Sequence, residues 1–215
     1  MKVGVFAGTF VDTRMGVELL KSRGFDTLSF PISKNPKEQS HLQYYSKDEL
    51  TNIVEKKIVE AKNEGAEKIF IYCNSLSASI DVDKLTQSQN IEIITPFDFY
   101  KNLDNRYKDI VILAANSKSA HGIDKIISEK IFRNTISIGM LSIVEEIEKK
   151  TLPRDIVSKL GLKELFKFFN SMEKKPDAII LACTHFPYMK EEFKKLTNIE
   201  ILDPAEDMIH KLKSK

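Results

Sequence analysis

The sequence predicts an α/β fold built around mainly parallel sheets. Short runs of isoleucine, valine, leucine and phenylalanine alternate with longer stretches that have helical polarity patterns. Several of the short runs are continuously apolar, which is typical of strands buried on both faces in a helix-covered parallel sheet. Repeated strand–helix–strand units imply right-handed crossovers. The 215 residues suffice for one large domain or for two lobes of about 100 residues each.

The apolar runs are the expected strands. In chain order they are Lys2–Ala7, Thr27–Ile32, Lys68–Cys73, Ile91–Thr95, Asp109–Ala114, Thr135–Ile138, Ala178–Cys183 and Ile199–Leu202. Their lengths and their β-branched composition favour strands over short buried helices.

Helices are expected between these strands. One stretch, Met15–Arg23, separates the first two strands. Ser46 and Glu49 have the spacing of a capping box and open a second helix. A third helical region runs from Pro153 to Met172 with a break near Gly161, and its leucine and phenylalanine stripe favours core packing.

Composition excludes several classes of protein. Hydrophobic residues make up 42% of the chain, which excludes wholesale disorder. Lysine and arginine number 33, aspartate and glutamate 31, so the net charge of +2 predicts no nucleic-acid partner. No apolar run reaches the roughly 18 residues of a membrane span. Because Met1–Phe6 lacks the pattern of a secretory signal, the expected location is the reducing cytoplasm.

The common cofactor and metal motifs are absent from the sequence. Gly4–Gly8 follows the first strand without completing a dinucleotide fingerprint, and no Gly-Lys-Ser/Thr P-loop occurs. Neither cysteine belongs to a Cys-x-x-Cys pair, and no two histidines are spaced as His-x-x-x-His. The sequence therefore predicts neither a metal nor an organic cofactor.

Cys73 and Cys183, the only cysteines, occur in matching contexts. Each ends an apolar strand and precedes small polar residues and a helical stretch. Ligands of parallel sheets bind beyond the carboxyl ends of the strands, and helix N-termini favour a thiolate. The alternatives are two buried core cysteines, which are common, and a disulfide, which the expected compartment disfavours.

Five segments together resemble the aspartate/glutamate racemase superfamily. They are Cys73–Ala78, Cys183–Pro187, Gly4–Phe6, Leu141–Glu146 and Asp203–Glu206. The Cys-Thr-His-Phe-Pro sequence that starts at Cys183 is the most specific of them. Because the segments come from both ends and the middle, the resemblance spans most of the chain.

The resemblance implies two pseudo-symmetric three-layer α/β lobes with mainly parallel sheets and an active site in the cleft between them. The expected division is an N-terminal lobe of residues 1–95, a second lobe of residues 96–200 and a C-terminal segment of residues 201–215 that packs back on the first lobe. A homodimer is expected from the same resemblance.

The implied activity is cofactor-independent racemisation of an amino acid, either aspartate or glutamate. Racemisation without a cofactor needs a base on one face of the α-carbon and an acid on the other. By resemblance, Cys73 and Cys183 fill these roles. His185 assists Cys183 or contacts the substrate, and Glu145, or its neighbour Glu146, is the partner acid.

One segment departs from the family pattern. Glutamate racemases typically place an aspartate just after the first strand, and here that place is taken by Ala7. Thr9, Asp12, Thr13 and Arg14 are the candidates to replace it. Arg14 is also a candidate clamp for a substrate carboxylate, because guanidinium binds carboxylates through two parallel hydrogen bonds. The alternative for Arg14 is an exposed surface arginine.

The remaining candidates for substrate binding are polar residues that follow expected strands. They are Asn74, Ser75, Asn116, Ser117, Ser119 and Thr184. Simple helix capping is the alternative for the cluster that starts at Asn116. The polar loop Ser33–Lys37 either faces the substrate or is an ordinary surface turn.

Two further functions remain open. Hydantoin racemases and maleate isomerases share the fold, whereas arylmalonate decarboxylases rely on one cysteine and fit this chain less well. A catalytically silent amino-acid-binding protein is the other alternative, and the missing aspartate favours it.

Overall fold

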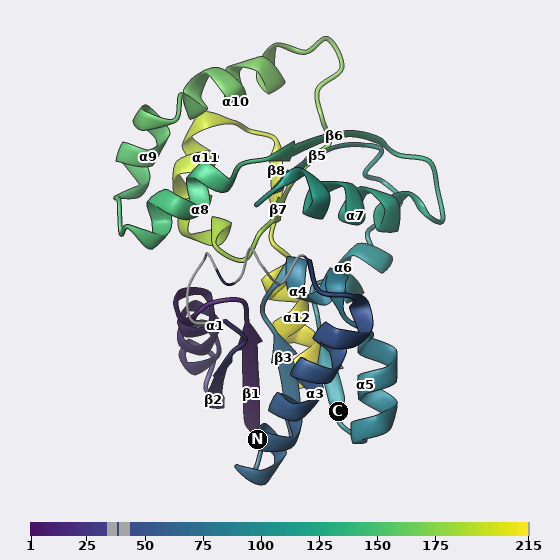
Figure 1. Cartoon of the computed structure of the whole chain (residues 1–215). Coiled ribbons are helices and arrows are strands. Elements are labelled where there is room, and N and C mark those ends of the chain that lie inside the picture. Colours follow the sequence, from purple (N-terminus) through teal and green to yellow (C-terminus); the bar gives the residue numbers. More distant parts are fainter. Residues whose placement is uncertain (34–37, 39–43, 215) are drawn as a thin grey trace. The chain divides into compact units, whose positions relative to one another are not determined.

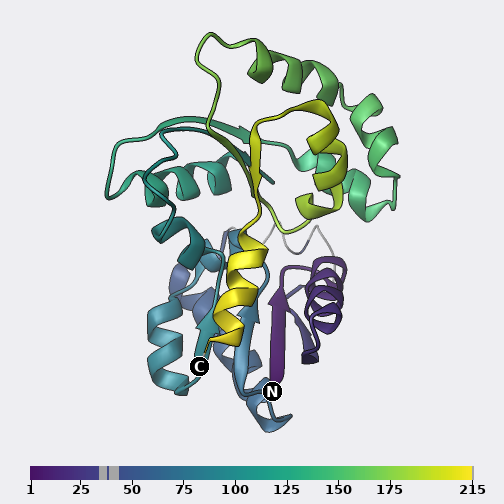
Figure 2. The same cartoon turned by 180° about the vertical axis from the view of Figure 1, so that it is seen from behind.

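The computed structural model describes residues 1–33, 38 and 44–214 (Figures 1 and 2). The chain divides into two compact units, Met1–Asp98 with Ala205–Lys215 (unit 1) and Phe99–Pro204 (unit 2). Each unit has one four-stranded sheet in which all paired strands are parallel. The predicted α/β class with parallel sheets is therefore confirmed.

Unit 1 contains the strand order β2-β1-β3-β4. The strands are β1 (Lys2–Ala7), β2 (Asp26–Pro31), β3 (Lys68–Ile71) and β4 (Glu92–Ile94). The helices are α1 (Phe10–Ser22), α3 (Lys47–Asn63), α4 (Asn74–Ser79) and α5 (Val82–Gln89), with most of α12 (Pro204–Lys213) and the start of α6 (Phe97–Lys101).

Helices cover both faces of the unit 1 sheet. On one face, Val54 and Ile58 of α3 pack with Phe6 and Ile71 of the strands. On the other face, residues of α1 and of α12, such as Met208, pack against β1 and β3. The C-terminal helix thus lies among the N-terminal elements, as the yellow helix beside the purple and blue ones shows (Figures 1 and 2).

Local capping explains where two helices of unit 1 begin. Helix α3 starts after Ser46, which forms the predicted capping box with Glu49. Helix α1 starts at Phe10, earlier than the Met15 predicted from apolar periodicity. Thr9 and Asp12 form a second capping box that fixes this earlier start.

Unit 2 repeats the same strand order as β6-β5-β7-β8. The strands are β5 (Asp109–Ala114), β6 (Asn134–Gly139), β7 (Ala178–Ala182) and β8 (Glu200–Leu202). The helical segments are α7 (Ser117–Ser128), α8 (Leu141–Glu148), α9 (Pro153–Lys159), α10 (Leu162–Ser171), the 3₁₀ segment η2 (Phe186–Met189) and α11 (Lys190–Leu196).

The core of unit 2 lies between its sheet and helices α8 to α11. Leu113 and Leu181 of the strands pack with Phe166 and Phe193 of α10 and α11. The predicted break in the helical region is confirmed, because Gly161 separates α9 from α10 with a φ of +63°. Within the described ranges, we find no helix with the length and apolar composition needed to span a membrane.

Candidate functional site

The two cysteines occupy the same topological position in their units. Cys73 follows β3 and Cys183 follows β7, and β3 and β7 hold the same place in the two strand orders. Both are free thiols, with 3% and 7% of the residue exposed. Each thiol therefore lies at the carboxyl edge of its own sheet, where parallel sheets bind ligands.

Cys73 begins helix α4 and contacts hydroxyl groups. Its Sγ lies 3.3 Å from Oγ of Ser75, where either atom can donate the hydrogen bond. The Oγ of Ser77 donates to the carbonyl oxygen of Cys73 at 2.7 Å, which fixes the backbone that carries the thiol. Asn74, the next residue after the thiol, is buried.

The turn after β1 lies beside the end of β3 because these strands are paired, with Phe6 opposite Ile71. Asp12 stabilises this turn through hydrogen bonds. Its carboxylate accepts hydrogen bonds from the backbone N–H of Gly8 at 3.1 Å and of Thr9 at 2.6 Å, and from the Thr9 hydroxyl at 2.9 Å. Asp12 is buried, so these bonds hold a charged group and the turn together.

The other two candidates for the missing aspartate lie on different sides of α1. Thr13 is buried, and its hydroxyl donates to the carbonyl oxygen of Thr9 at 2.6 Å. Arg14 faces solvent, where its Nε lies 3.7 Å from Oε1 of Glu18. The structure thus brings Thr9, Asp12 and Thr13 together and places Arg14 apart from them. In the loop Ser33–Lys37, only Ser33 is among the described residues, and its N–H donates to the Gly8 carbonyl at 2.8 Å.

Cys183 belongs to a line of three functional groups. Its Sγ lies 3.8 Å from Nδ1 of His185, and Nε2 of His185 lies 3.3 Å from Oε1 of Glu148. His185 is buried and Glu148 nearly so. A thiol, an imidazole and an orienting carboxylate in this order can move a proton to and from the sulfur.

The carboxylate beside His185 is not one of the two acids that the sequence offered. Glu145 is exposed on α8, whereas Glu148 ends the same helix and reaches the imidazole. Both residues follow the same apolar stretch. Helical spacing makes Glu148 a candidate beside Glu145, since residues three apart lie on neighbouring positions of a helix, but it does not choose between them.

Glu146 is buried and serves the structure of unit 2. Its carboxylate lies 2.8 Å from Nζ of Lys159 and 3.0 Å from Nζ of Lys149, and it accepts the Thr151 hydroxyl hydrogen bond at 2.9 Å. The bonds from Lys159, Lys149 and Thr151 lower the pKa of Glu146 to about 2. Glu146 therefore ties α8 to α9 as an anion at neutral pH.

The turn after β5 matches the turn after β1. Asn116 caps α7, and its Oδ1 accepts the backbone N–H of Ser119 at 2.9 Å. Ser117 is exposed and Ser119 is buried, as is Thr184 after Cys183. The predicted capping role is therefore present, and the turn lies at the same sheet edge as Cys183 because β5 pairs with β7.

Gly139 allows this turn to approach the end of β6. A Cβ atom at Gly139 would lie 2.4 Å from the Ser117 nitrogen and 2.6 Å from the carbonyl carbon of Asn116. Such distances are far inside van der Waals contact, so the turn in its present place requires glycine at this position.

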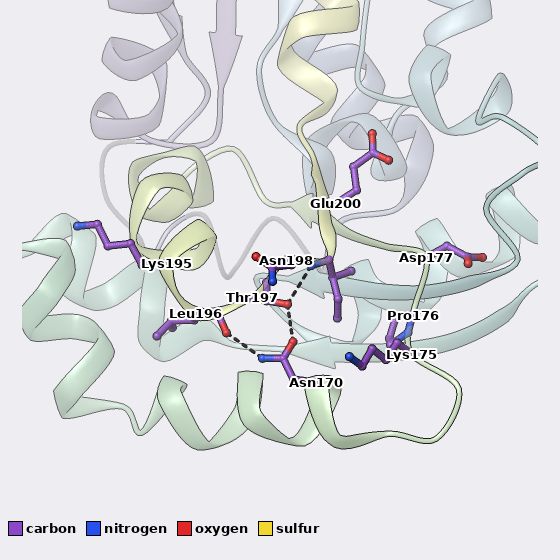
Figure 3. A pocket seen from close by; sticks show the side chains of 10 residues that line it. Asn170, Lys175, Pro176, Asp177, Lys195, Leu196, Thr197, Asn198 and Glu200 are labelled. Carbon is purple, nitrogen blue, oxygen red and sulfur yellow. Dashed lines mark hydrogen bonds between the residues drawn. The ribbon is translucent and has the colours of Figure 1, made fainter.

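A pocket of about 610 Å³ lies at the opposite edge of the unit 2 sheet. It is lined by residues that precede β7 and β8, including Asn170, Lys175 and Thr197 (Figure 3). The Thr197 hydroxyl donates to Oδ1 of Asn170 at 2.6 Å, and Asn170 donates to the Leu196 carbonyl at 2.8 Å. Because β7 runs from this pocket towards Cys183, the pocket lies away from the thiol. The described part of the chain contains no cluster of three residues suited to hold a metal.

Comparison with known proteins supports one family. A glutamate racemase from Buchnera aphidicola subsp. Schizaphis graminum is 29% identical over 149 residues, which cover 67% of this chain and 58% of the relative. The matched region thus spans less than two thirds of that relative's length. No family model matches the chain.

Two solved structures share the fold. Glutamate racemase from Francisella tularensis, solved in complex with D-glutamate, has a TM-score of 0.67 at 20% identity. The matched region covers 98% of this chain and 80% of the Francisella chain. Aspartate racemase from Picrophilus torridus has a TM-score of 0.64 at 15% identity, with 96% and 90% covered. With its two equivalent parallel sheets and its sequence relatives, the chain belongs to the aspartate/glutamate racemase superfamily.

Proposed function

We propose that the protein is a cofactor-independent racemase of aspartate or glutamate that uses Cys73 and Cys183 as its acid and base. The observation that carries this proposal is the equivalence of the two thiols. Each follows the corresponding strand of a sheet with the same strand order, and each lies at the sheet edge that binds ligands.

The chemistry requires two groups that exchange roles. A thiolate removes the α-proton from one face of the amino acid, and a thiol returns a proton to the opposite face. In the reverse reaction the two cysteines enter with opposite protonation states. An ordinary cysteine has a pKa of about 8.5, so a neighbouring group has to help form the thiolate.

The groups around each thiol supply this help. His185, oriented by Glu148, exchanges a proton with Cys183, and we assign Glu148 the role expected for Glu145. Near Cys73, the hydroxyl of Ser75 lies 3.3 Å from the sulfur and exchanges a hydrogen bond with it.

The capped turns are the proposed binding sites for substrate carboxylates. Thr9 and Asn116 hold equivalent places after the first strand of each sheet. Backbone and side-chain donors in such turns bind carboxylates well. Ser119, Asn74 and Thr184 complete the donor set at the same sheet edges. The D-glutamate in the Francisella structure supports an acidic amino acid as substrate. We also expect a homodimer, which light scattering measures directly.

Proton exchange at the α-carbon tests the proposal. L- and D-aspartate and L- and D-glutamate are each incubated with the protein in deuterated water, and deuterium at the α-carbon is followed by NMR. We expect exchange and inversion with one of the two amino acids. A hydantoin and maleate serve as alternative substrates. Turnover of either, or ligand binding without any exchange, contradicts the proposed activity.

A further inference from the structure

A second set of titratable groups, distinct from His185 and Glu148, lies towards the carboxyl edge of the unit 2 sheet, where Cys183 is found. Asp203, Lys190 and Tyr100 all belong to unit 2, and the proposed proton transfers do not use them. Asp203 and Lys190 form an ion pair, and Tyr100 is completely buried. The presence of these three groups in one part of unit 2 indicates a shared role.

Strand register places Asp203 beside the strand that carries Cys183. Strand β7 pairs with β8, with Ile180 opposite Leu202, so Asp203 continues β8 next to Leu181. Leu181 and Cys183 alternate with Ile180 and both belong to the core cluster that packs against α11. The carboxylate therefore emerges at the same sheet edge as the thiol.

Lys190 reaches this carboxylate from α11. Its Nζ lies 3.3 Å from Oδ2 of Asp203, and the two side chains are 24% and 8% exposed. Lys190 is the first residue of α11, and the short segment η2 links it to His185. The ammonium thus offsets the negative charge of a nearly buried carboxylate, and removing either partner leaves the other charge uncompensated.

Tyr100 supplies a phenol that stays neutral. The Tyr100 side chain is buried, with 1% of the residue exposed. Burial raises the pKa of Tyr100 well above its ordinary value, and the negative charges of Cys183 and Asp203 raise the pKa further. The phenol therefore remains protonated and adds no charge of its own.

We propose that Lys190, Asp203 and Tyr100 are positioning residues that keep Cys183 able to alternate between thiol and thiolate. This inference rests on the proposed racemase function. A carboxylate alone would favour the thiol, and an ammonium alone would favour the thiolate. The ion pair cancels both effects, and the neutral phenol stabilises the thiolate by its dipole.

The titratable and charged groups around Cys183 come from several elements. Among the residues that the structure describes, they include His185 before η2, Glu148 on α8, Lys190 on α11, Asp203 after β8 and Tyr100 on α6. His185 and Glu148 are left unchanged in the test, so that any shift in thiol reactivity comes from the other three residues.

Alkylation of Cys183 measures its thiolate directly. In a Cys73→Ser background, the rate of reaction with iodoacetamide is recorded against pH, and the pH of half-maximal rate is determined. Lys190→Gln should move this pH up by about one unit and Asp203→Asn should move it down by about as much. The double variant should return to the parent value because both charges are gone. Tyr100→Phe should move it up.

Matched variants separate this role from a structural one. Lys194→Gln removes the same charge from α11, where Lys194 pairs with Glu191, and should leave the profile unchanged. Tyr107→Phe removes a buried hydroxyl that binds Arg106 and should also have no effect. Circular dichroism checks that each variant is folded.

Shifts of the same sign for Lys190→Gln and Asp203→Asn, or no shift in either, overturn the inference. So does a double variant that fails to return towards the parent value. Alkylation needs no substrate, so its outcome is independent of the exchange assay. If the opposite shifts appear while no amino acid exchanges its α-proton, the proposed function fails and the tuning of the thiol stands.

Discussion

At the scale of single residues, the position of Cys73 and Cys183 in the fold distinguishes them from ordinary buried cysteines. Buried free cysteines are ordinary components of protein cores. Cys73 and Cys183 also contribute to the packed clusters of their units. What sets them apart is that each follows the corresponding strand of an equivalent sheet, and this shared position is the basis of the chemical role proposed for both.

Replacing either thiol by a hydroxyl tests its chemical role. Cys73→Ser and Cys183→Ser should each lower racemisation by about 10²–10⁴-fold, because a serine hydroxyl cannot supply the base at neutral pH. The two side chains have nearly the same shape, so the fold should persist. Racemisation is followed by polarimetry and folding by circular dichroism. Near-full turnover by either variant contradicts the two-thiol mechanism.

Glu148, whose carboxylate lies beside His185, provides a sharper test of the proposed mechanism. Glu148→Gln keeps the shape of the side chain and removes the charge beside His185 Nε2. A hydrogen bond to a charged group contributes about 1.5–3 kcal/mol, so turnover should fall about ten- to hundredfold. Steady-state racemisation rates measure this loss.

Glu145→Gln is the matched control for that variant. It makes the same chemical change on the same helix, at an exposed position. Turnover by Glu145→Gln should stay within twofold of the parent. If instead this variant is the impaired one, the resemblance-based choice of Glu145 is right and the contact of Glu148 has no catalytic role.

The sequence indicated that His185 lies close to Cys183, but it did not indicate that Glu148 is the carboxylate beside His185. A cysteine and a histidine separated by one residue at a strand end have little freedom to point elsewhere. The acid comes from a helix distant in sequence, and its rotation about the axis decides whether Glu145, Glu146 or Glu148 faces His185. That rotation follows from the packing of Ile143 and its neighbours into the core, which periodicity alone does not resolve.

At the scale of elements, the turn after β5 depends on its contact with β6. Gly139→Ala introduces a Cβ that would lie 2.4 Å from the Ser117 nitrogen. The Asn116 turn must then move, which should destabilise the protein by about 1–3 kcal/mol. If the turn binds a substrate carboxylate, KM should also rise. Urea unfolding and steady-state kinetics measure the two effects.

Gly122→Ala serves as the comparison for Gly139→Ala. Gly122 lies within α7, where an added Cβ meets nothing within 4 Å. Alanine in an open helical position should stabilise the protein by about 0.5–1 kcal/mol. Equal effects of the two substitutions would show that close approach at Gly139 does not matter.

The link between α8 and α9 should give stability a distinct pH dependence. Hydrogen bonds from Lys159, Lys149 and Thr151 lower the pKa of Glu146 from 4.5 to about 2. A lowered pKa in the folded state adds stability above pH 4.5, and this contribution is lost as the pH falls towards 2. Glu146→Gln should therefore lower Tm at pH 7 and have little effect near pH 2. Thermal unfolding across this range checks the sign, and an equal Tm loss at both ends contradicts it.

Elements were predictable where one local signal dominated. The strands are continuous apolar runs, and the start of α3 follows from Ser46 and Glu49. The predicted start of α1 at Met15 was wrong. Apolar periodicity begins only at that residue, whereas the polar pair Thr9 and Asp12 caps the helix earlier. Capping by a buried aspartate is a tertiary property, since Asp12 is buried only once the turn and the sheet are in place.

At the scale of the whole molecule, each unit has a core of its own. The unit 1 core combines the first residues of the chain with the last helix, because Met208, Ile209 and Leu212 of α12 pack with Val3 and Val5 of β1. The amphipathic pattern of α12 indicates a buried face, but pattern alone does not indicate which sheet receives it.

Separate cores predict separate responses to core substitutions. Met208→Ala removes a side chain that is 1% exposed and packs against the sheet of unit 1. The cavity should destabilise unit 1 by about 2–5 kcal/mol. Native-state hydrogen exchange should therefore speed up at the amides of β1 and β3, while those of β5 and β7 keep their protection.

Phe166→Ala gives the reciprocal case. Phe166 is 1% exposed and packs with Phe169 and Phe193 in the core of unit 2. Its loss should cost about 3–5 kcal/mol and should speed exchange in β5 and β7 while leaving β1 and β3 protected. Each substitution thus serves as the control of the other. If both variants lose protection equally in all four strands, the units unfold as one cooperative body and the prediction of separate responses is wrong.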